Sequence, residues 1–351
     1  MNKKIINVAI VGVTGYGGLE LLRLLHNHPT VHVLSIHNTS TDSEEISISY
    51  PHLKSMYKIT PTPFDPVHIM QSADLVFFAT SSGVSKDLAQ PFIESNFPVI
   101  DLSGDFRLNA TDYKTWYKKA PATQALLDQA NYSLADFYQN DRHYIANPGC
   151  YATATLLALA PLAQQQLLDQ ENIIIDAKSG LSGAGKSLNL SSHFVNVNEN
   201  FSMYKPNQHQ HIPEITQQLK QWQPDVNHIQ FTTSLLPINR GIFVSAYVKL
   251  NKQVSADTLQ DIFETTYQDK PFIRIMPKDH LPNIKQVVGT NFADIGLTYN
   301  PDTKYLTIVS VIDNMIKGAA GQAIQNMNHL FNLDETTGLQ LIAQYVSLIH
   351  I

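Results

Sequence analysis

A continuous apolar run from Ile5 to Val11 is followed by Gly12, Gly15 and Gly18 and then by a helical pattern over residues 19–25. An uninterrupted apolar run is typical of a strand buried on both faces of a parallel sheet. Strand, glycine turn and helix in this order form the context in which a pyrophosphate approaches the backbone at a helix N-terminus. The spacing differs from the usual G-x-G-x-x-G, and a plain βα turn is the alternative. We expect the first unit of a dinucleotide-binding fold.

More strand and helix patterns follow in alternation. Val31 to His37 and Asp74 to Ala79 have the pattern of strands, and a helical pattern runs from Val84 to Glu94. Pro98 to Leu102 adds another strand. Strands that alternate with helices predict a doubly wound α/β fold with a parallel sheet.

The segment after the second strand bears on which dinucleotide binds. Residues Asn38-Thr39-Ser40-Thr41 contain no carboxylate where an NAD enzyme usually bonds the ribose 2′-hydroxyl. A 2′-phosphate is acceptable there, which favours NADP, although the segment has no clear arginine to pair with that phosphate.

Length and composition limit the kind of protein. A chain of 351 residues is long for one core and suggests two domains. The net charge of −6 is spread without a basic block, which argues against nucleic-acid and anionic-membrane partners. A single cysteine excludes an intrachain disulfide, and neither a zinc-binding spacing nor a membrane-length apolar span is present. We expect a cytoplasmic enzyme without a metal.

The pattern changes after residue 150. Asn109 to Asp141 is loop-rich, whereas the later residues combine strands and helices in irregular order, which predicts a mixed sheet in a second domain. The expected elements are strands 172–178, 228–236, 241–250 and 272–276, a helix over 255–268, a hairpin of strands 292–299 and 305–312, and a final small-residue-rich helix over 317–331.

The only cysteine stands at a strand-to-helix corner. Tyr144 to Ala146 is a short apolar strand, Asn147-Pro148-Gly149 makes a sharp turn, and an Ala- and Leu-rich run from Ala152 to Leu168 predicts a buried helix. Cys150 therefore stands at a helix N-terminus, where backbone amides and the helix dipole favour thiolate and offer donors to an oxyanion. A small buried hydrophobe and a nucleophile are the two interpretations of this cysteine.

Residues Gly180 to Ser187 match the P-loop pattern G-x-x-x-x-G-K-[ST] directly after a strand, so a P-loop nucleotide hydrolase is a competing hypothesis. A P-loop must open a firm helix, however, and residues 188–198 are rich in Asn and β-branched residues, which form helices poorly. The same glycines can instead form a flexible loop over a nicotinamide or a substrate.

A further constellation is His209-Gln210-His211-Ile212-Pro213-Glu214. Pro213 suits the first turn of a helix, and in the extended backbone expected before it His209 and His211 project to one side. Exposed polar histidines, a metal pair and an acid–base partner for Cys150 are the interpretations. The metal pair lacks a third ligand at a diagnostic spacing.

Together these motifs resemble the N-acetyl-γ-glutamyl-phosphate reductase family of arginine biosynthesis. The sister family, aspartate-semialdehyde dehydrogenase, shares the fold and a Cys/His pair but not the cysteine and histidine segments in this form. The resemblance assigns the second glycine-rich segment to the family and so argues against a P-loop. The motifs run in family order to about Asn328 and are Gly12-Val-Thr-Gly-Tyr-Gly-Gly-Leu-Glu-Leu, Asp101-Leu-Ser-Gly-Asp-Phe-Arg-Leu, Asn147-Pro-Gly-Cys-Tyr-Ala-Thr, Ser179-Gly-Leu-Ser-Gly-Ala-Gly, His209-Gln-His-Ile-Pro-Glu-Ile, Pro237-Ile-Asn-Arg-Gly-Ile and Ile312-Asp-Asn-Met-Ile-Lys-Gly-Ala-Ala-Gly-Gln-Ala.

The resemblance implies NADPH-dependent reduction of N-acetyl-L-glutamyl 5-phosphate to the 5-semialdehyde, with a Cys150 thioester and His209 as the acid–base group. It implies Arg107 for the phosphate and Arg240 for the carboxylate, an assignment that can be exchanged. The other implied substrate-binding residues are His211, Glu214 and Asn147. The implied cofactor-binding residues are Gly12, Thr14, Gly15, Tyr16, Gly17, Ser81, Ser182, Gly183 and Asn314.

The resemblance also implies an architecture. A Rossmann NADP-binding domain would take residues 1–149 and the C-terminal segment 317–351. A glyceraldehyde-3-phosphate-dehydrogenase-like α+β domain, catalytic and oligomeric, would take residues 150–316. A homodimer or homotetramer is expected, acting on a small molecule. The remaining alternatives are a reductase of another acyl phosphate and a non-catalytic NADP-binding protein in which Cys150 is only buried.

Overall fold

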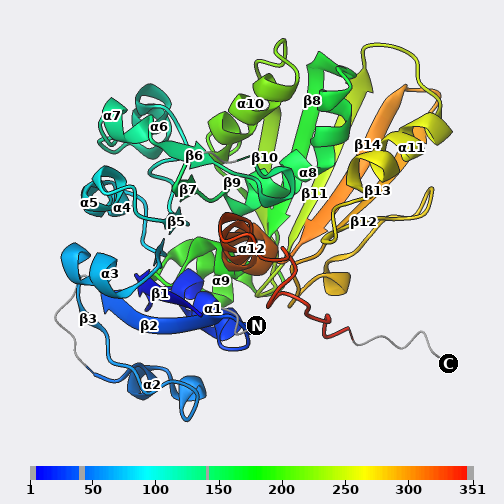
Figure 1. The fold of residues 1–351 in the computed structure, drawn as a ribbon. Coiled ribbons are helices and arrows are strands. Elements are labelled where there is room, and N and C mark those ends of the chain that lie inside the picture. Colours follow the sequence, from blue (N-terminus) through cyan, green and yellow to red (C-terminus); the bar gives the residue numbers. More distant parts are fainter. Residues whose placement is uncertain (1–4, 39–43, 140–141, 346–351) are drawn as a thin grey trace. The chain divides into compact units, whose positions relative to one another are not determined.

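The computed structural model describes residues 5–38, 44–139 and 142–345, and the chain divides into two compact units (Figure 1). Of the described residues, unit 1 holds 5–38, 44–139, 142–148 and 319–339, and unit 2 holds 149–318 and 340–345. The chain passes between the units after residues 148, 318 and 339, so neither unit is one continuous segment.

Unit 1 contains the expected parallel sheet, in the order β3-β2-β1-β4-β5-β7-β6. All of its strand pairs are parallel, and β1 and β4 are almost wholly buried, as their apolar runs predict. The strand order reverses between β1 and β4, which is where doubly wound folds bind their ligands. The strands are β1 Ile6–Val11, β2 Val31–Asn38, β3 Thr62–Pro63, β4 Leu75–Phe78, β5 Val99–Asp101, β6 Ala130–Tyr132 and β7 Tyr144–Ala146.

The helices of unit 1 differ from expectation in two places. The helix expected over 84–94 is broken into α4 and α5, because Pro91 has no amide hydrogen for the helical ladder. The segment expected to be loop-rich contains α6, whose N-terminus is capped by Asn109 through the amide of Asp112, as well as α7 and β6. The helices and turns are α1 Tyr16–Leu25, α2 Ile46–Ser49, η1 Pro51–Leu53, α3 Pro66–Ser72, α4 Ser85–Leu88, α5 Gln90–Glu94, α6 Ala110–Tyr117, α7 Gln124–Leu127, η2 Ala135–Phe137 and α12 Gly321–Leu330.

Helix α12 joins unit 1 through buried amide side chains. Asn326 donates from Nδ2 to the Ser133 carbonyl at 3.1 Å and to Oδ1 of Asn147 at 3.0 Å, and its own Oδ1 accepts from Ser133 Oγ. Oε1 of Gln322 accepts from the amide of Ala135 at 3.2 Å. Burying an amide side chain costs free energy unless it is hydrogen-bonded. These contacts therefore favour one position of α12 within unit 1.

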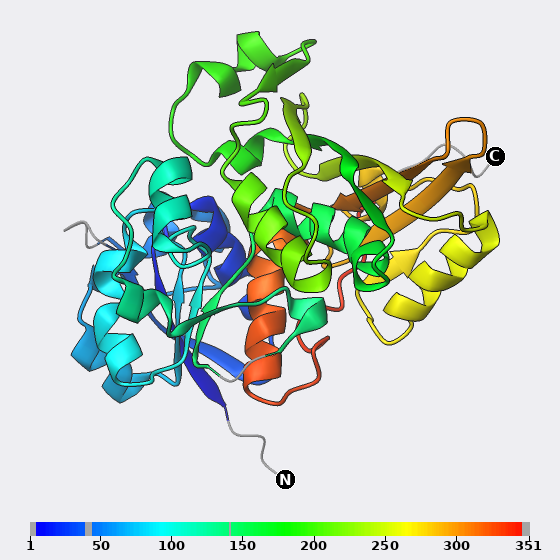
Figure 2. The ribbon, with the colours of Figure 1, turned by 90° about the horizontal axis from the view of Figure 1, so that it is seen from above.

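Unit 2 contains the expected mixed sheet, in the order β12-β13-β14-β11-β8-β10-β9, with antiparallel and parallel neighbours. Three helices, α8, α10 and α11, cover one face of this sheet (Figures 1 and 2). The strands are β8 Leu168–Ser179, β9 Ser202–Tyr204, β10 Gln230–Leu235, β11 Ile242–Leu250, β12 Ile273–Ile275, β13 Ala293–Asn300 and β14 Tyr305–Ile312. The helices and turns are α8 Cys150–Gln164, η3 Leu181–Ala184, η4 Leu190–Ser192, α9 Phe194–Val197, α10 His211–Trp222, α11 Ala256–Tyr267 and η5 Ile284–Gln286. The π-helical turn η6 Ile316–Ala320 begins in unit 2 and ends in unit 1.

Two expected helices have different bounds. The helix after the cysteine begins at Cys150 itself and ends at Gln164, because residue 168 already belongs to β8. The final helix is not regular from residue 317: its first turn is π-helical, and the amide of Gly318 donates to the carbonyl of Asp313, five residues earlier.

The buried helix α8 contains a proline, and a hydroxyl from another helix bonds to the carbonyl that this proline leaves without a donor. Pro161 lies inside α8 and cannot donate to the carbonyl of Leu157, four residues earlier. The hydroxyl of Tyr267, at the end of α11, donates to that carbonyl at 2.5 Å. The orphaned acceptor is thereby satisfied, and α11 is held against α8.

Replacing Tyr267 by Phe leaves this carbonyl without its hydroxyl donor, and we expect a loss of about 1–3 kcal/mol in the free energy of unfolding. Urea unfolding at neutral pH measures the loss. In a Pro161→Ala background the new amide can donate to Leu157, so Tyr267→Phe should then cost clearly less. Equal costs in the two backgrounds would contradict this role of the hydroxyl.

Candidate active site

The first glycine turn lies in unit 1, between β1 and α1. Gly12 has φ +87°, and a Cβ there would lie 2.7 Å from the carbonyl oxygen of Ala79, so only glycine fits. No side chain caps the N-terminus of α1, where Gly15 is the N-cap and Tyr16 and Gly17 begin the helix. These residues fit a dinucleotide, since an uncapped helix end and a close-packed glycine turn suit a pyrophosphate.

The turn that contains Ser81 follows β4 and is held by a buried carboxylate. Asp105 accepts from the amides of Gly83 at 2.6 Å and Lys86 at 3.1 Å. Its neighbour Asp101 is also fully buried, and burial, aided by the charge of Asp105, raises the pKa of Asp101 to about 6. Sequence reasoning gave these two acids no role, although their motif was noticed.

Arg107 and Asn147 also lie in unit 1, in the turns that follow β5 and β7. The Arg107 guanidinium donates from Nε to the Asn147 carbonyl and from Nη2 to the Leu102 carbonyl, both at 2.8 Å. The Asn147 side chain donates to the carbonyl of Ala319 at 3.2 Å and accepts from Asn326. In this structure both expected substrate-binding residues brace the turn that leads to Cys150.

Cys150 is the first residue of α8 in unit 2 and is partly exposed. The preceding amide, of Gly149, donates to Oε1 of the fully buried Glu214 at 2.7 Å. The N-cap residue Gly149 has no side chain to cap α8, so the positive end of the helix dipole lies where the thiol stands, with the Glu214 carboxylate on the amide just before it. This geometry places Cys150 at the corner that the sequence predicts.

Gly318 is a neighbour of the cysteine that sequence reasoning missed. A Cβ on Gly318 would lie 2.7 Å from Cβ of Cys150, closer than two such atoms approach in proteins. The small-residue run 318–321 predicts close packing on the first domain, whereas the close neighbour of Gly318 is Cys150 of unit 2.

The histidine pair lies at the start of α10. Helix α10 already begins at His211 and Gln210 is helical in conformation, so the extended backbone expected here is wrong. The two rings are nevertheless 4.6 Å apart. The amide of His211 donates to Nδ1 of His209 at 3.2 Å, which assigns the ring proton of neutral His209 to Nε2. Glu214 places Oε2 3.9 Å from Nε2 of His211.

His209 is buried against aromatic rings. The ring of Tyr151 lies 5.2 Å from it, edge to face, and the hydroxyl of Tyr204 donates to that of Tyr151 at 3.0 Å. Burial lowers the pKa of His209 to about 2, with smaller contributions from the neighbouring charges of His211 and Lys205. Burial, with a smaller contribution from the charge of Cys150, raises the pKa of Tyr204 to about 12. Both tyrosines therefore contact the His209 ring, and Tyr204 also senses the charge of Cys150.

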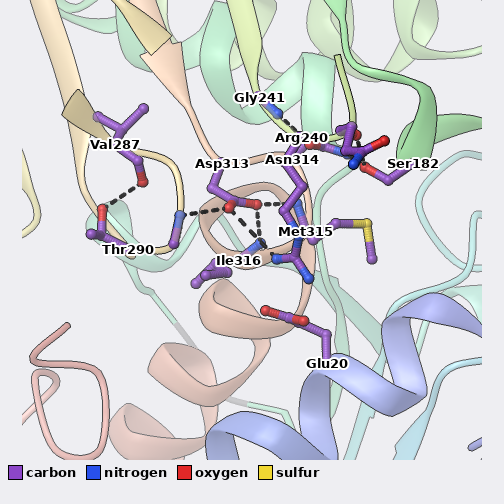
Figure 3. Close-up of polar contacts among 12 residues, drawn as sticks. Glu20, Ser182, Arg240, Gly241, Val287, Thr290, Asp313, Asn314, Met315 and Ile316 are labelled. Atoms are coloured by element: carbon purple, nitrogen blue, oxygen red, sulfur yellow. Dashed lines mark hydrogen bonds and ion pairs between the residues drawn. The ribbon is translucent and has the colours of Figure 1, made fainter. Parts of the chain in front are cut away.

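The second glycine-rich segment, residues 180–187, is hydrogen-bonded to the loop between β10 and β11 (Figure 3). Ser182 donates from its amide and from Oγ to the carbonyl of Asn239, at 3.0 and 2.7 Å. Asn314 donates from Nδ2 to Ser182 Oγ at 2.9 Å and accepts from the amide of Gly241 at 2.7 Å. A Cβ on Gly183 would lie 2.9 Å from Ser179 Oγ. These bonds hold the loop that was expected to be flexible.

The same segment does not open a helix of P-loop length, since only the short turns η3 and η4 and the four-residue α9 follow. Unit 2 thus brings together Cys150, His209, His211 and Glu214, and, around the Ser182 loop, Gly183, Arg240 and Asn314. The turns with Gly12, Thr14 and Ser81, and Arg107 with Asn147, belong to unit 1.

The described part of the chain holds no group of three or more His, Cys, Asp or Glu side chains placed to bind a metal ion. Among the same residues, none of the helices combines the length and apolarity needed to span a membrane. Residues Thr39 to Thr41, on which the NADP expectation partly depends, lie outside the described residues.

Family models match both parts of the chain. The model for "Semialdehyde dehydrogenase, NAD binding domain" matches residues 7–146, and the model for "Semialdehyde dehydrogenase, dimerisation domain" matches residues 150–314. Among curated proteins, the N-acetyl-gamma-glutamyl-phosphate reductases of Streptococcus mutans and Lactococcus lactis are each 53% identical to the chain. These alignments cover 97% and 95% of this chain and 99% and 98% of the relatives.

Solved structures with low sequence identity share the fold. Aspartate semialdehyde dehydrogenase II of Vibrio cholerae is 17% identical, with a TM-score of 0.69 over 94% of this chain and 99% of that one. The aspartate semialdehyde dehydrogenase of Candida albicans, solved with NADP, is 12% identical, with a TM-score of 0.63 over 93% and 99%.

The buried His209 makes stability depend on pH. The unfolded chain takes up a proton as the pH falls through about 6.5, whereas folded His209 does so only near pH 2. The contribution of His209 to the free energy of unfolding is therefore fully present above pH 6.5. Below pH 6.5 this contribution is lost, at about 1.4 kcal/mol per pH unit. Between pH 7.5 and 5.0, urea unfolding of His209→Gln should show a drop in stability about 2 kcal/mol smaller than that of the wild type.

The matched control is His228→Gln, since the His228 side chain is 62% exposed. We expect this variant to keep the wild-type dependence of stability on pH. An unchanged drop in His209→Gln would contradict the lowered pKa of His209.

Proposed function

The chain belongs to the N-acetyl-gamma-glutamyl-phosphate reductase family, and from that premise we propose that Cys150 carries its chemistry as a covalent nucleophile. The protein is an NADPH-dependent oxidoreductase of arginine biosynthesis. It reduces N-acetyl-L-glutamyl 5-phosphate to N-acetyl-L-glutamate 5-semialdehyde and releases phosphate. Bound NADPH supplies the hydride.

The observation that carries the proposal is the position of Cys150, partly exposed at the uncapped N-terminus of α8. The helix dipole favours thiolate there, and a thiolate is the form that attacks an acyl phosphate. The S–C bond forms as the C–O bond to phosphate breaks, which leaves an acyl thioester on Cys150. The helix amides are donors for the negative carbonyl oxygen that develops.

We propose that His209 donates a proton to the carbonyl oxygen once the thioester carbon has accepted the hydride, and takes it back as the C–S bond breaks, which leaves the aldehyde and the Cys150 thiolate. Its Nδ1 accepts from the amide of His211, so the proton is exchanged at Nε2. An anionic substrate nearby raises the pKa of a histidine, which helps His209 to exchange a proton during the reaction. Glu214 holds the corner through the Gly149 amide and lies beside His211, and we assign both residues to positioning and substrate contact.

The remaining assignments follow charge and location. Arg107 is proposed for the phosphate and Arg240 for the carboxylate, because a guanidinium binds either group bidentately. Asn147 is proposed for substrate contact at the turn before Cys150. Unit 1 is proposed as the NADP-binding domain and unit 2 as the catalytic domain. The proposed cofactor contacts are Gly12, Thr14, Gly15, Tyr16, Gly17 and Ser81 in unit 1 and Ser182, Gly183 and Asn314 in unit 2.

Cys150→Ser tests the covalent step. We expect kcat for phosphate-dependent NADP reduction with N-acetylglutamate semialdehyde to fall by about 10³-fold or more, because a neutral hydroxyl replaces the thiolate. Iodoacetamide should alkylate the wild type at neutral pH, more slowly with substrate present, and should not label the variant, since Cys150 is the only cysteine.

Near-wild-type turnover by Cys150→Ser would refute the covalent mechanism. A wild type that resists alkylation would instead favour a buried cysteine in a non-catalytic binding protein. Running the assay with aspartate semialdehyde and with NAD in parallel separates this reductase from one that acts on another acyl phosphate.

We propose that the protein is a homodimer or homotetramer that associates through unit 2. The family model matching residues 150–314 is named for dimerisation. The sheet face opposite α8, α10 and α11 carries the cross-strand partners Ile174 and Tyr247, which are 39% and 38% exposed. Partly exposed apolar pairs on an uncovered sheet face are suited to burial against a second copy.

Tyr247→Glu places a charge on this face and should shift the mass measured by light scattering towards that of one chain, because a buried unpaired carboxylate is costly. Ile48→Glu is the matched control, since Ile48 is an exposed apolar residue of unit 1. An unchanged oligomer in Tyr247→Glu, or a wild type that is already monomeric, would contradict the proposed face.

A cytoplasmic location is proposed as well, because a reducing compartment keeps a partly exposed thiol such as Cys150 in its reduced form.

A further inference from the structure

Asp313 is a fully buried carboxylate at the end of β14, and both of its oxygens accept backbone hydrogen bonds (Figure 3). Oδ1 accepts from the amides of Met315 at 2.8 Å and Ile316 at 3.1 Å. Oδ2 accepts from the amide of Gly289 at 2.8 Å. These donors hold the carboxylate in one orientation, and they compensate for the burial of its charge.

The charge of Asp313 also faces a guanidinium. Nη1 of Arg240 lies 3.6 Å from Oδ2, and the Arg240 side chain is 32% exposed (Figure 3). The ion pair therefore links a rigid interior anion to a cation that solutes can reach. Water screens ion pairs at the surface, but it screens this one less because one partner is fully buried.

The backbone beside Arg240 is fixed by the residue next to Asp313. Asn314 accepts from the amide of Gly241, and the segment before Arg240 bonds to the Ser182 loop. A Cβ on Gly180 would lie 2.9 Å from the amide nitrogen of Arg240, so this backbone is also closely packed. With the main chain held, the direction of the long Arg240 side chain depends on the groups around its guanidinium, and Asp313 is a buried anion among them.

We propose that Asp313 is a positioning residue that holds the Arg240 guanidinium ready for the carboxylate of the substrate. This inference rests on the proposed function, which assigns that carboxylate to Arg240. A guanidinium that is already oriented loses less side-chain entropy when it binds an anion, so its affinity is higher. Asp313 acts on binding through Arg240 and does not touch the substrate.

Asp313→Asn, Arg240→Gln and the double variant test the proposal, with KM and kcat measured for N-acetylglutamate semialdehyde. We expect Asp313→Asn to raise KM about 10-fold with kcat changed by less than about 3-fold, and Arg240→Gln to raise KM by about 100-fold. Because Asp313 acts through Arg240, the double variant should match Arg240→Gln within about 2-fold. Asp294→Asn is the matched control: Asp294 is a buried partner of Arg274 in the same unit and should leave KM unchanged.

An Asp313→Asn effect on KM that is just as large in the Arg240→Gln background would overturn the inference. So would a loss of kcat that follows the loss of thermal stability, which is the behaviour of a purely structural turn. If Arg240→Gln itself leaves KM unchanged, the carboxylate assignment of the proposed function fails first, and the inference fails with it.

A second experiment avoids altering Asp313, whose backbone contacts also support folding. In Arg240→Ala, added guanidinium ion should occupy the place beside Asp313 and restore kcat/KM by about 10-fold at millimolar concentrations below those that unfold the protein. Sodium chloride at equal ionic strength is the control. If Arg240→Ala is folded and guanidinium ion does not restore its kcat/KM, Asp313 does not form a binding site for a guanidinium group, and the inference is contradicted.

Discussion

The hydrogen bond from the Gly149 amide to Glu214 fixes the corner on which the site of unit 2 depends. A fully buried carboxylate on α10 bonds to the residue just before Cys150, so α8 and α10 are held in one register. The histidines at the start of α10 and the tyrosine beside Cys150 then necessarily lie together. A buried charge would be costly without such a donor, so the same contact that orders the site also makes Glu214 tolerable inside the protein.

Burial shifts the pKa values of Asp101 in unit 1 and His209 in unit 2 in the direction that favours the neutral form. Asp101 keeps its proton to about pH 6, and His209 stays uncharged down to about pH 2. Glu214, Asp105 and Asp313 are buried as well, and each accepts hydrogen bonds from backbone amides. Backbone amide donors thus compensate for the burial of these three carboxylates. Asp313 has an additional ion pair with Arg240.

The sequence predicts well what local patterns determine. The longer strands of both sheets, the glycine turn before α1 and the corner at Cys150 follow from apolar runs and turn residues within a few positions, whereas the short edge strands β3, β6 and β9 were not predicted. The sequence predicts helix boundaries less well. Pro91 splits the helix expected over 84–94, and α10 begins at His211, where extended backbone was expected. The roles of Asp105, Asp313 and Gly318 depend on residues distant in the sequence, which no spacing reveals. The family resemblance supplied the reaction, whereas composition and spacing supplied only the fold class and a nucleophile.

The seating of α12 has a consequence for how the protein is made. A ribosome releases the first 148 residues well before α12, and the amides of Asn326 that Ser133 and Asn147 require are then still missing. Early chains therefore hold every strand of the parallel sheet but lack the helix α12 that bonds to Ser133 and Asn147, until nearly all of unit 2 has been translated. The unit that is synthesised first is thus completed last, and nascent chains that stall before residue 321 should depend most on chaperones.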